Sequence, residues 1–206
     1  MAGIQKNISP THIDILKEVG NIGAGNAATA LAQLINKKIT MRVPEVNIMS
    51  FDEIIDVVGG PENMVAGIYL RFMGGIDGNI LFIIPYRNTL NLLDIIFGEK
   101  KRDLFCEFDP IERSALAEIG NILAGSYLSA ISSLTKMLLK PSVPALAIDM
   151  AGAILSVPLT YYGHVGDTAL LIDTVFEEGE NLIKGHFFLI PDVDGYDNLF
   201  LALGGV

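Results

Sequence analysis

Two long segments of the chain share one pattern of hydrophobic and polar positions. Plotted at 100° per residue, each has apolar side chains over most of the circumference and a polar stripe within about 40° of one line. Stripe one lies in residues 10–36 and consists of Asp14, Glu18, Asn21 and Gly25. Stripe two lies in residues 110–136 and consists of Ser114, Glu118, Asn121 and Gly125. Both segments are therefore predicted to be helices that are buried on most sides and expose only the stripe.

Both predicted helices begin with the same pair of signals. A serine or an aspartate, whose side chain can accept backbone N–H groups, is followed by a proline, which fits the first helical position. These pairs are Ser9-Pro10 and Asp109-Pro110. We expect the helices to extend to about residues 36 and 136. Gly20 and Gly23 fall on the buried side of the first helix, where we expect them to let the helix approach a sheet closely.

Between and after the helices, short apolar runs bounded by turn residues predict strands. The clearest runs are residues 66–72, 79–84, 169–175 and 186–190. Gly74-Gly75 marks a turn between the first two of them. The sequence thus predicts an α+β fold with a largely antiparallel sheet and the two long helices packed on it.

The second half of the chain repeats the first. Residues 9–50 and 109–150 align without a gap at an offset of 100, and 13 of these 42 positions are identical. The later parts correspond more loosely, 78–85 with 185–191 and 88–98 with 194–204. Two copies of about 100 residues cannot form a stacked array of short repeats. We therefore expect one domain over residues 1–206, an internally duplicated pseudo-twofold pair of repeats at 9–98 and 109–204.

Composition excludes several classes of protein. The 206 residues are 50% hydrophobic and 18% charged, which argues against disorder. Mean hydropathy is +0.45, yet the longest uncharged stretches, 119–135 and 150–166, fall short of the roughly 18–20 apolar residues of a spanning helix. No apolar signal core follows the first residues. We expect a soluble, cytoplasmic protein without membrane insertion.

The charge and the motifs of the sequence argue against nucleic-acid, metal and nucleotide binding. The formal net charge is −10, and the densest basic group, residues 100–102, is flanked by acidic residues, so nucleic-acid binding is not expected. Cys106 is the only cysteine, and the three histidines lack metal-ligand spacing. The glycine-rich run at 20–25 follows no predicted strand and has the wrong order for a dinucleotide fingerprint. No metal or cofactor of its own is expected.

The stripes carry the candidate chemistry. A glutamate and an asparagine three residues apart could simply form a solvent-exposed helix face, but the two halves agree at only a third of the aligned positions and still retain both residues. A carboxylate can pair with a lysine or arginine of a partner or act as a base. A carboxamide can orient a water molecule without ionising. Since one helical turn separates the two side chains, one partner active site could receive both.

The spacing resembles a known signature. Asp14-x3-Glu18-x2-Asn21-x22-Pro44 occurs in the first half, and the second half repeats it from Ser114 to Pro144. This pattern is similar to the motif [DS]-x3-E-x2-N-x22-P of the CheC/CheX/FliY family of CheY-phosphate phosphatases in bacterial chemotaxis. Two intact copies resemble the CheC-like branch of that family, and we expect no flagellar-switch domain after the second copy.

The resemblance implies an enzyme, a protein aspartyl-phosphate phosphatase acting on the phosphorylated response regulator CheY. Asn21 or Asn121 would position the attacking water, and Glu18 or Glu118 would dock on a lysine of the regulator. Asp14, Gly25, Ser114 and Gly125 would contact the partner. The Mg²⁺ would belong to the regulator, and the receptor deamidase CheD would be a further partner.

Two alternatives stay open at this point. One is a non-catalytic adaptor that binds CheD or the flagellar switch. The other is a purely structural duplicate, in which both stripes are covered and Glu18 and Glu118 are paired internally. The flanks differ between the halves, Gly23 against Leu123 for example. The sequence therefore leaves open which site is more active, which regulator is the substrate, and the oligomeric state.

Overall fold

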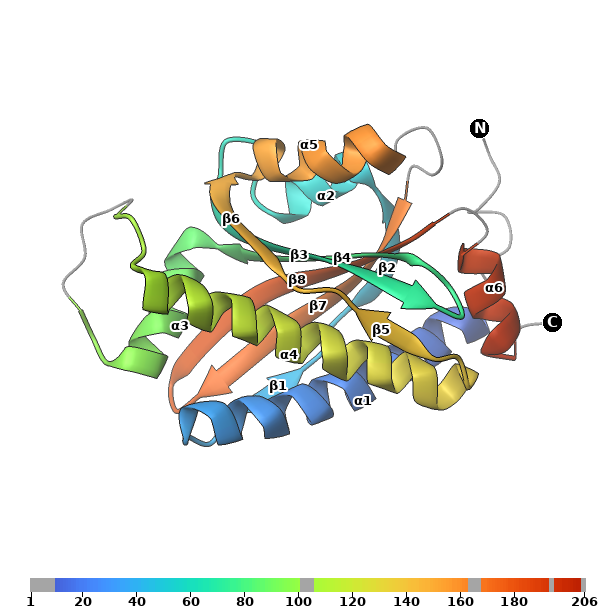
Figure 1. The fold of residues 1–206 in the computed structure, drawn as a ribbon, viewed down its shortest axis with the longest axis horizontal. Coiled ribbons are helices and arrows are strands. Elements are labelled where there is room, and N and C mark those ends of the chain that lie inside the picture. The colour runs from blue at the N-terminus through green and yellow to red at the C-terminus, as the bar shows by residue number, and fades with distance from the viewer. Residues whose placement is uncertain (1–9, 101–105, 163–167, 193–194, 205–206) are drawn as a thin grey trace.

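One curled antiparallel sheet with helices on both faces forms the core of the computed structural model (Figure 1). The structure describes residues 10–100, 106–162, 168–192 and 195–204. The predicted α+β class is confirmed. The helices are α1 (Pro10–Ile35), α2 (Phe51–Val57), α3 (Tyr86–Phe97), α4 (Pro110–Thr135), α5 (Ala151–Tyr162) and α6 (Gly195–Ala202). The strands are β1 (Thr40–Arg42), β2 (Val46–Ser50), β3 (Met64–Gly74), β4 (Gly78–Pro85), β5 (Leu139–Pro141), β6 (Ala145–Met150), β7 (Thr168–Glu178) and β8 (Asn181–Pro191).

The two halves of the chain exchange strands. The sheet order is β1-β7-β8-β4-β3-β5, with β2 also paired to β7 and β6 also paired to β3. The first two strands of each half thus lie on a strand of the other half, and the two hairpins β3–β4 and β7–β8 meet through β4 and β8. The edges of the sheet are therefore β1 with β2 on one side and β5 with β6 on the other.

Strand registers in the two halves correspond. Val46 pairs with Ile172, and the residue 100 positions later, Leu146, pairs with Ile68. Met41 pairs with Phe176, as Pro141 does with Phe72. The elements also follow one another in the same order in both halves. An internal duplication would produce these features, but the division into repeats at 9–98 and 109–204 stays a prediction.

The two faces of the sheet carry separate hydrophobic cores. Helices α1 and α4 lie side by side and antiparallel on one face, while α2 and α5 cover the other (Figure 1). The larger core includes Leu16, Val19, Leu116, Leu123, Ile68, Ile172, Phe82 and Phe187. The smaller core includes Phe51, Ile54, Leu81, Ile154 and Phe188. Strands β4 and β8 contain runs of consecutive buried apolar residues. Because consecutive strand residues point to opposite faces, these two strands contribute side chains to both cores.

The two long helices were predicted correctly, and several shorter elements were missed. Strands β7 and β8 extend beyond the predicted apolar runs to a hairpin at Gly179, where polar residues still pair with each other. Neither α2 nor α5 was predicted. Helix α2 has only seven residues, and α5 contains Pro158, which removes a backbone donor and is rare inside helices.

Within the described ranges, none of the helices combines the length and the apolar character needed to cross a membrane. The predicted cytoplasmic location stays a prediction.

Candidate functional site

Both stripes lie on the open side of their helices. All four residues of stripe one, Asp14, Glu18, Asn21 and Gly25, are exposed. In stripe two, Ser114 and Glu118 are exposed, whereas Asn121 and Gly125 are half-buried. Within the part of the chain that the structure describes, neither Glu18 nor Glu118 makes a hydrogen bond or an ion pair. The hypothesis of a purely structural duplicate, which required these carboxylates to be paired internally, is therefore wrong.

Two glycines set how α1 sits on its neighbours. A Cβ built on Gly20 would lie 3.2 Å from Val43 Cγ1 and 3.6 Å from Ile172 Cγ2, so Gly20 faces β7 and the loop between β1 and β2. A Cβ on Gly23 would lie 2.4 Å from Tyr127 Cδ1 of α4. The expectation that both glycines approach the sheet is correct for Gly20 and wrong for Gly23. Gly23 instead admits the ring of a tyrosine from the other motif helix.

The glycines of the stripes have a different role. Around Gly25 and Gly125, a Cβ would meet no atom within 4 Å. Neither glycine is therefore needed for packing within the chain. Each leaves a flat, open position one turn beyond the stripe asparagine, where the backbone of the helix is accessible to a partner.

Val43 contacts α1 at Gly20, one residue before Asn21 of stripe one. It holds the loop between β1 and β2 against the middle of α1, and Pro44, the next residue, is exposed there. Pro44, the last residue of the motif, thus lies in a loop that packs on the motif helix of its own half. Val43 was not singled out by the sequence, since it reads as an ordinary apolar residue at a strand boundary.

The second half makes a different contact at this place. Gly120 faces Ile68 of β3, to which a Cβ would come within 2.4 Å, and Val143 is 86% exposed. Arg113, next to Ser114, donates a hydrogen bond from Nη2 to the backbone carbonyl of Leu146 in β6, at 3.3 Å. Stripe two is thus tied to the β6 edge by an arginine side chain that stripe one lacks.

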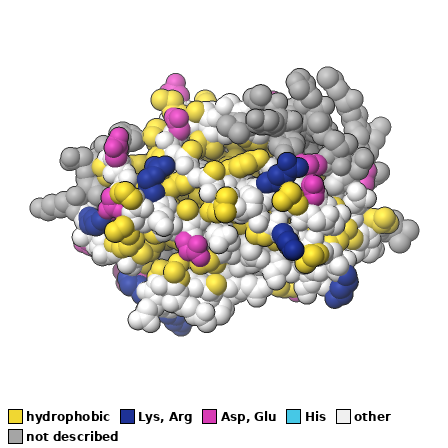
Figure 2. Space-filling model, in the orientation of Figure 1, with side chains coloured by type: hydrophobic (Ala, Val, Ile, Leu, Met, Phe, Trp, Pro, Cys, Tyr) yellow, Lys and Arg dark blue, Asp and Glu magenta, His cyan; other side chains and the backbone are white. Residues whose placement is uncertain are grey.

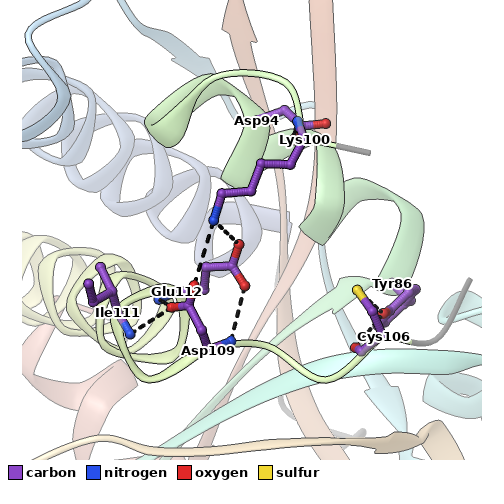
Figure 3. Close-up of polar contacts among 7 residues, drawn as sticks. All are labelled: Tyr86, Asp94, Lys100, Cys106, Asp109, Ile111 and Glu112. Carbon is purple, nitrogen blue, oxygen red and sulfur yellow. Dashed lines mark hydrogen bonds and ion pairs between the residues drawn. The ribbon is translucent and has the colours of Figure 1, made fainter. Parts of the chain in front are cut away.

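The start of α4 is fixed by a capping network (Figure 3). The Asp109 carboxylate accepts hydrogen bonds from the backbone N–H groups of residues 111 and 112, and Glu112 accepts one from the backbone N–H of Asp109. The ammonium group of Lys100 lies 3.0 Å from Glu112 Oε1 and 3.6 Å from Asp109 Oδ2. The hydrogen bond to Glu112 raises the pKa of Lys100 above its ordinary value. The predicted N-cap is confirmed, and the pattern Asp-x-x-Glu that announces this capping box was readable in the sequence.

The start of α1 is held by an aromatic contact instead. His12, at the position that corresponds to Glu112, is buried, and its ring stacks on Phe200 of α6 with the centroids 4.4 Å apart. The predicted N-cap Ser9 lies outside the described residues. Both motif helices are therefore anchored near their first turn, but by unrelated chemistry.

The surface over α4 is not strongly charged. Figure 2 shows hydrophobic and uncharged side chains over much of this face, with charged groups of both signs scattered among them. Among the described residues, no group of three or more His, Cys, Asp or Glu side chains could hold a metal ion. The arrangement can present a carboxylate and a carboxamide together to a partner.

Comparison with known proteins gives consistent matches. The model of the CheC-like family matches residues 12–48 and 111–148, the two segments that contain the stripes. The CheY-P phosphatase CheC of Bacillus subtilis is 44% identical over 204 residues, which are 98% of either chain. The flagellar motor switch phosphatase FliY of the same organism is 28% identical over 127 residues, which are 62% of this chain and 33% of that protein.

Solved structures share the fold. The crystal structure of FliY from Thermotoga maritima superimposes with a TM-score of 0.73 at 21% identity, covering 96% of this chain and 98% of that one. At this identity, the likeness shows a common fold and no more.

Proposed function

The chain belongs to the CheC-like family, and on that premise we propose that it is a phosphatase that hydrolyses the aspartyl-phosphate of the chemotaxis response regulator CheY. The observation that carries the proposal is the pair of Glu and Asn at the same spacing on both α1 and α4, with both carboxylates and Asn21 exposed and Asn121 half-buried. The similarity over the whole chain to a protein named a CheY-P phosphatase supports it.

In the proposed reaction, the carboxamide of Asn21 or Asn121 enters the regulator's active site and orients a water molecule. The oxygen of this water attacks phosphorus, the bond from phosphorus to the aspartyl oxygen breaks, and inorganic phosphate and a free carboxylate result. A carboxamide suits this task because it donates and accepts hydrogen bonds without a change of charge. The contribution is one of positioning, as in other phosphoryl-transfer enzymes that orient a water.

The carboxylate of Glu18 or Glu118 has the second role. Being exposed and without an internal partner among the described residues, it is available to pair with a lysine of the regulator and fix the docked geometry. Asp14, Gly25, Ser114 and Gly125 would line the contact on either side. Mg²⁺ would be supplied by the regulator, where it neutralises phosphoryl charge.

The test is the rate of regulator dephosphorylation with the wild type, Asn21→Ala, Asn121→Ala and the double variant. Loss of a water-positioning group should reduce the acceleration about 100-fold or more when both sites are altered. Unchanged acceleration by a folded double variant would rule the proposal out. The same variants separate an enzyme from an adaptor. If the protein is an adaptor, the double variant should bind CheD or the flagellar switch as tightly as the wild type does, and neither form should accelerate regulator dephosphorylation.

A further inference from the structure

Asn21 of stripe one lies between two glycines at which the backbone of α1 closely approaches other elements. Gly20 precedes it and faces β7 and the loop between β1 and β2, and Gly23 follows it and faces the ring of Tyr127. Two residues correspond to a rotation of 200°, so Asn21 lies on the side of α1 opposite the ring. Tyr127 is therefore not part of the exposed stripe, but it packs on the helical turn that carries Asn21.

The ring of Tyr127 is held in place by the sheet. Tyr127 is completely buried, its ring packs on Phe187 of β8, and its hydroxyl is hydrogen-bonded to Thr174 of β7. A Cβ at residue 23 would lie 2.4 Å from Cδ1, 2.8 Å from Cε1 and 3.0 Å from Cγ, so the contact reaches the base of the ring. Because a close-packed ring between two strands has little room to yield, a larger side chain at residue 23 should displace α1 and not the ring.

The second half has no counterpart of this pair in its sequence. Leu123 aligns with Gly23, and Ala27 aligns with Tyr127, and both of these residues are completely buried. Helix α1 thus has the smaller residue at both aligned positions, and α4 has the larger one. A close contact between a glycine and a ring is therefore a property of site one, the site of stripe one, and not of site two, the site of stripe two.

We propose that Tyr127 is a positioning residue for Asn21: through Gly23, it sets where α1 holds the carboxamide that orients the attacking water. The inference rests on the proposed function, because it takes Asn21 to act on that water. A displacement of about 1 Å can lower the rate of a positioned reaction about 100-fold. The exposed side chain of Glu18 is flexible and can still reach a lysine of the regulator after such a displacement.

The experiment measures kcat and KM for phosphorylated CheY in an Asn121→Ala background, which leaves site one alone. Gly23→Ala should lower kcat about 10–100-fold and leave KM within about threefold. Tyr127→Phe keeps the ring and should leave kcat within about threefold, whereas Tyr127→Leu should lower it. In the Gly23→Ala/Tyr127→Leu variant, the added methyl group occupies space that the ring has vacated. Its kcat should return to within about threefold of the parent, as expected for two residues in direct contact.

Two controls separate positioning from a loss of stability. Gly23→Ala in an Asn21→Ala background, which leaves site two alone, should keep kcat within about threefold of its parent. Ile54→Val removes a buried methyl group from the smaller core, on the other face of the sheet, and should leave kcat of site one unaltered. If kcat falls equally at both sites, or if the Ile54 variant loses as much as Gly23→Ala, the inference is wrong.

A crystal structure of the Gly23→Ala protein gives a readout that does not depend on activity. The Cβ must retreat from 2.4 Å to an ordinary contact distance of about 3.5 Å, so the backbone of residues 20–24 should move by on the order of 1 Å relative to the sheet. A displaced Tyr127 ring beside an unmoved α1 would overturn the inference.

The rates also distinguish the inference from the proposed function. If the wild type accelerates dephosphorylation and the Asn121→Ala parent does not, Tyr127 positions no catalytic group and the inference fails alone. A wild type without acceleration contradicts the proposed function, and the displacement of α1 then still decides whether Tyr127 sets the position of Asn21.

Discussion

Gly23 of α1 lies directly under the ring of Tyr127 of α4, so closely that a Cβ at residue 23 would come within 2.4 Å of the ring. The Tyr127 ring also contacts Phe187 of β8, with centroids 4.4 Å apart, and its hydroxyl lies 3.1 Å from Thr174 Oγ1 of β7. One tyrosine from the second half therefore fixes the first motif helix, its own helix and the sheet relative to one another.

Gly23→Ala should destabilise the protein by about 1–3 kcal/mol, because the added methyl group overpacks the buried contact with Tyr127. Intrinsic helix propensity acts in the opposite direction, by about 1 kcal/mol in favour of alanine. Gly25→Ala is the matched control, since its Cβ meets no atom within 4 Å and only the propensity gain applies. Urea unfolding measures both. Equal effects of the two substitutions would contradict the packing described for Gly23.

Gly25→Leu should impair docking without lowering stability. An isobutyl group on the open position would hold a partner away from stripe one. In an Asn121→Ala background, which leaves only site one, kcat/KM for CheY-P should fall about tenfold, equivalent to 1.4 kcal/mol. Gln33→Leu in the same background, an exposed change two turns further along α1, should leave kcat/KM unaltered. A fall of the same size in both variants would indicate a general effect of surface leucines.

Glu112→Ala should cost about 1–3 kcal/mol of folding stability. Glu112 is only 4% exposed and accepts the backbone N–H of Asp109, which the substitution leaves without its capping partner. Lys100→Met removes an exposed ion-pair partner of Glu112 and Asp109 but leaves the backbone cap in place, and should cost less than about 1 kcal/mol. Thermal unfolding of both variants gives the comparison. A larger loss in the Lys100 variant would place the stabilisation in the ion pair and not in the cap.

Tyr127 should make the protein sensitive to alkaline pH. Burial raises the pKa of its phenol to about 12, against roughly 10 in an unfolded chain. The folded state keeps this proton to higher pH than the unfolded chain does. The contribution of Tyr127 to the free energy of unfolding is therefore fully present below pH 10 and is lost as the pH rises towards 12. Relative to Tyr127→Phe, the wild type should lose about 1 kcal/mol of unfolding free energy between pH 9 and pH 11. Urea unfolding at pH 9, 10 and 11 tests this, and a difference between the two proteins that stays constant with pH would contradict it.

The sequence determined the helices and the stripes well because their signals are local. The N-cap of α4 and the spacing of Glu118 and Asn121 depend only on neighbouring residues and on helical rotation. The position of Gly23 did not follow, because its contact is made by Tyr127 of the other half, and the aligned residue of the first half is Ala27, which has no ring. Pairing across the halves was not readable either, since β1 and β5 have three residues each and no hydrophobic period can be seen in so short a run.

Helix α5 shows a second limit. Its residues are apolar around the whole helix, so no face could be assigned from the sequence, and Pro158 argued against a helix altogether. The structure compensates by packing Ile154 and Leu155 into the smaller core and by placing Gly152 close to Pro61. Burial against α2 and the sheet outweighs the local cost of the proline.

The exchange of strands between the halves has a consequence for synthesis on the ribosome. When β3 has emerged, its partners β5 and β6 are still 65 or more residues from being made, a delay on the order of several seconds at typical translation rates. During that interval the apolar edge of β3 has no partner from its own chain and can pair with another nascent chain. The sheet edge at β3 therefore cannot be completed until β5 and β6 have been synthesised. The growing polypeptide should depend on chaperone protection until β6 has left the ribosome.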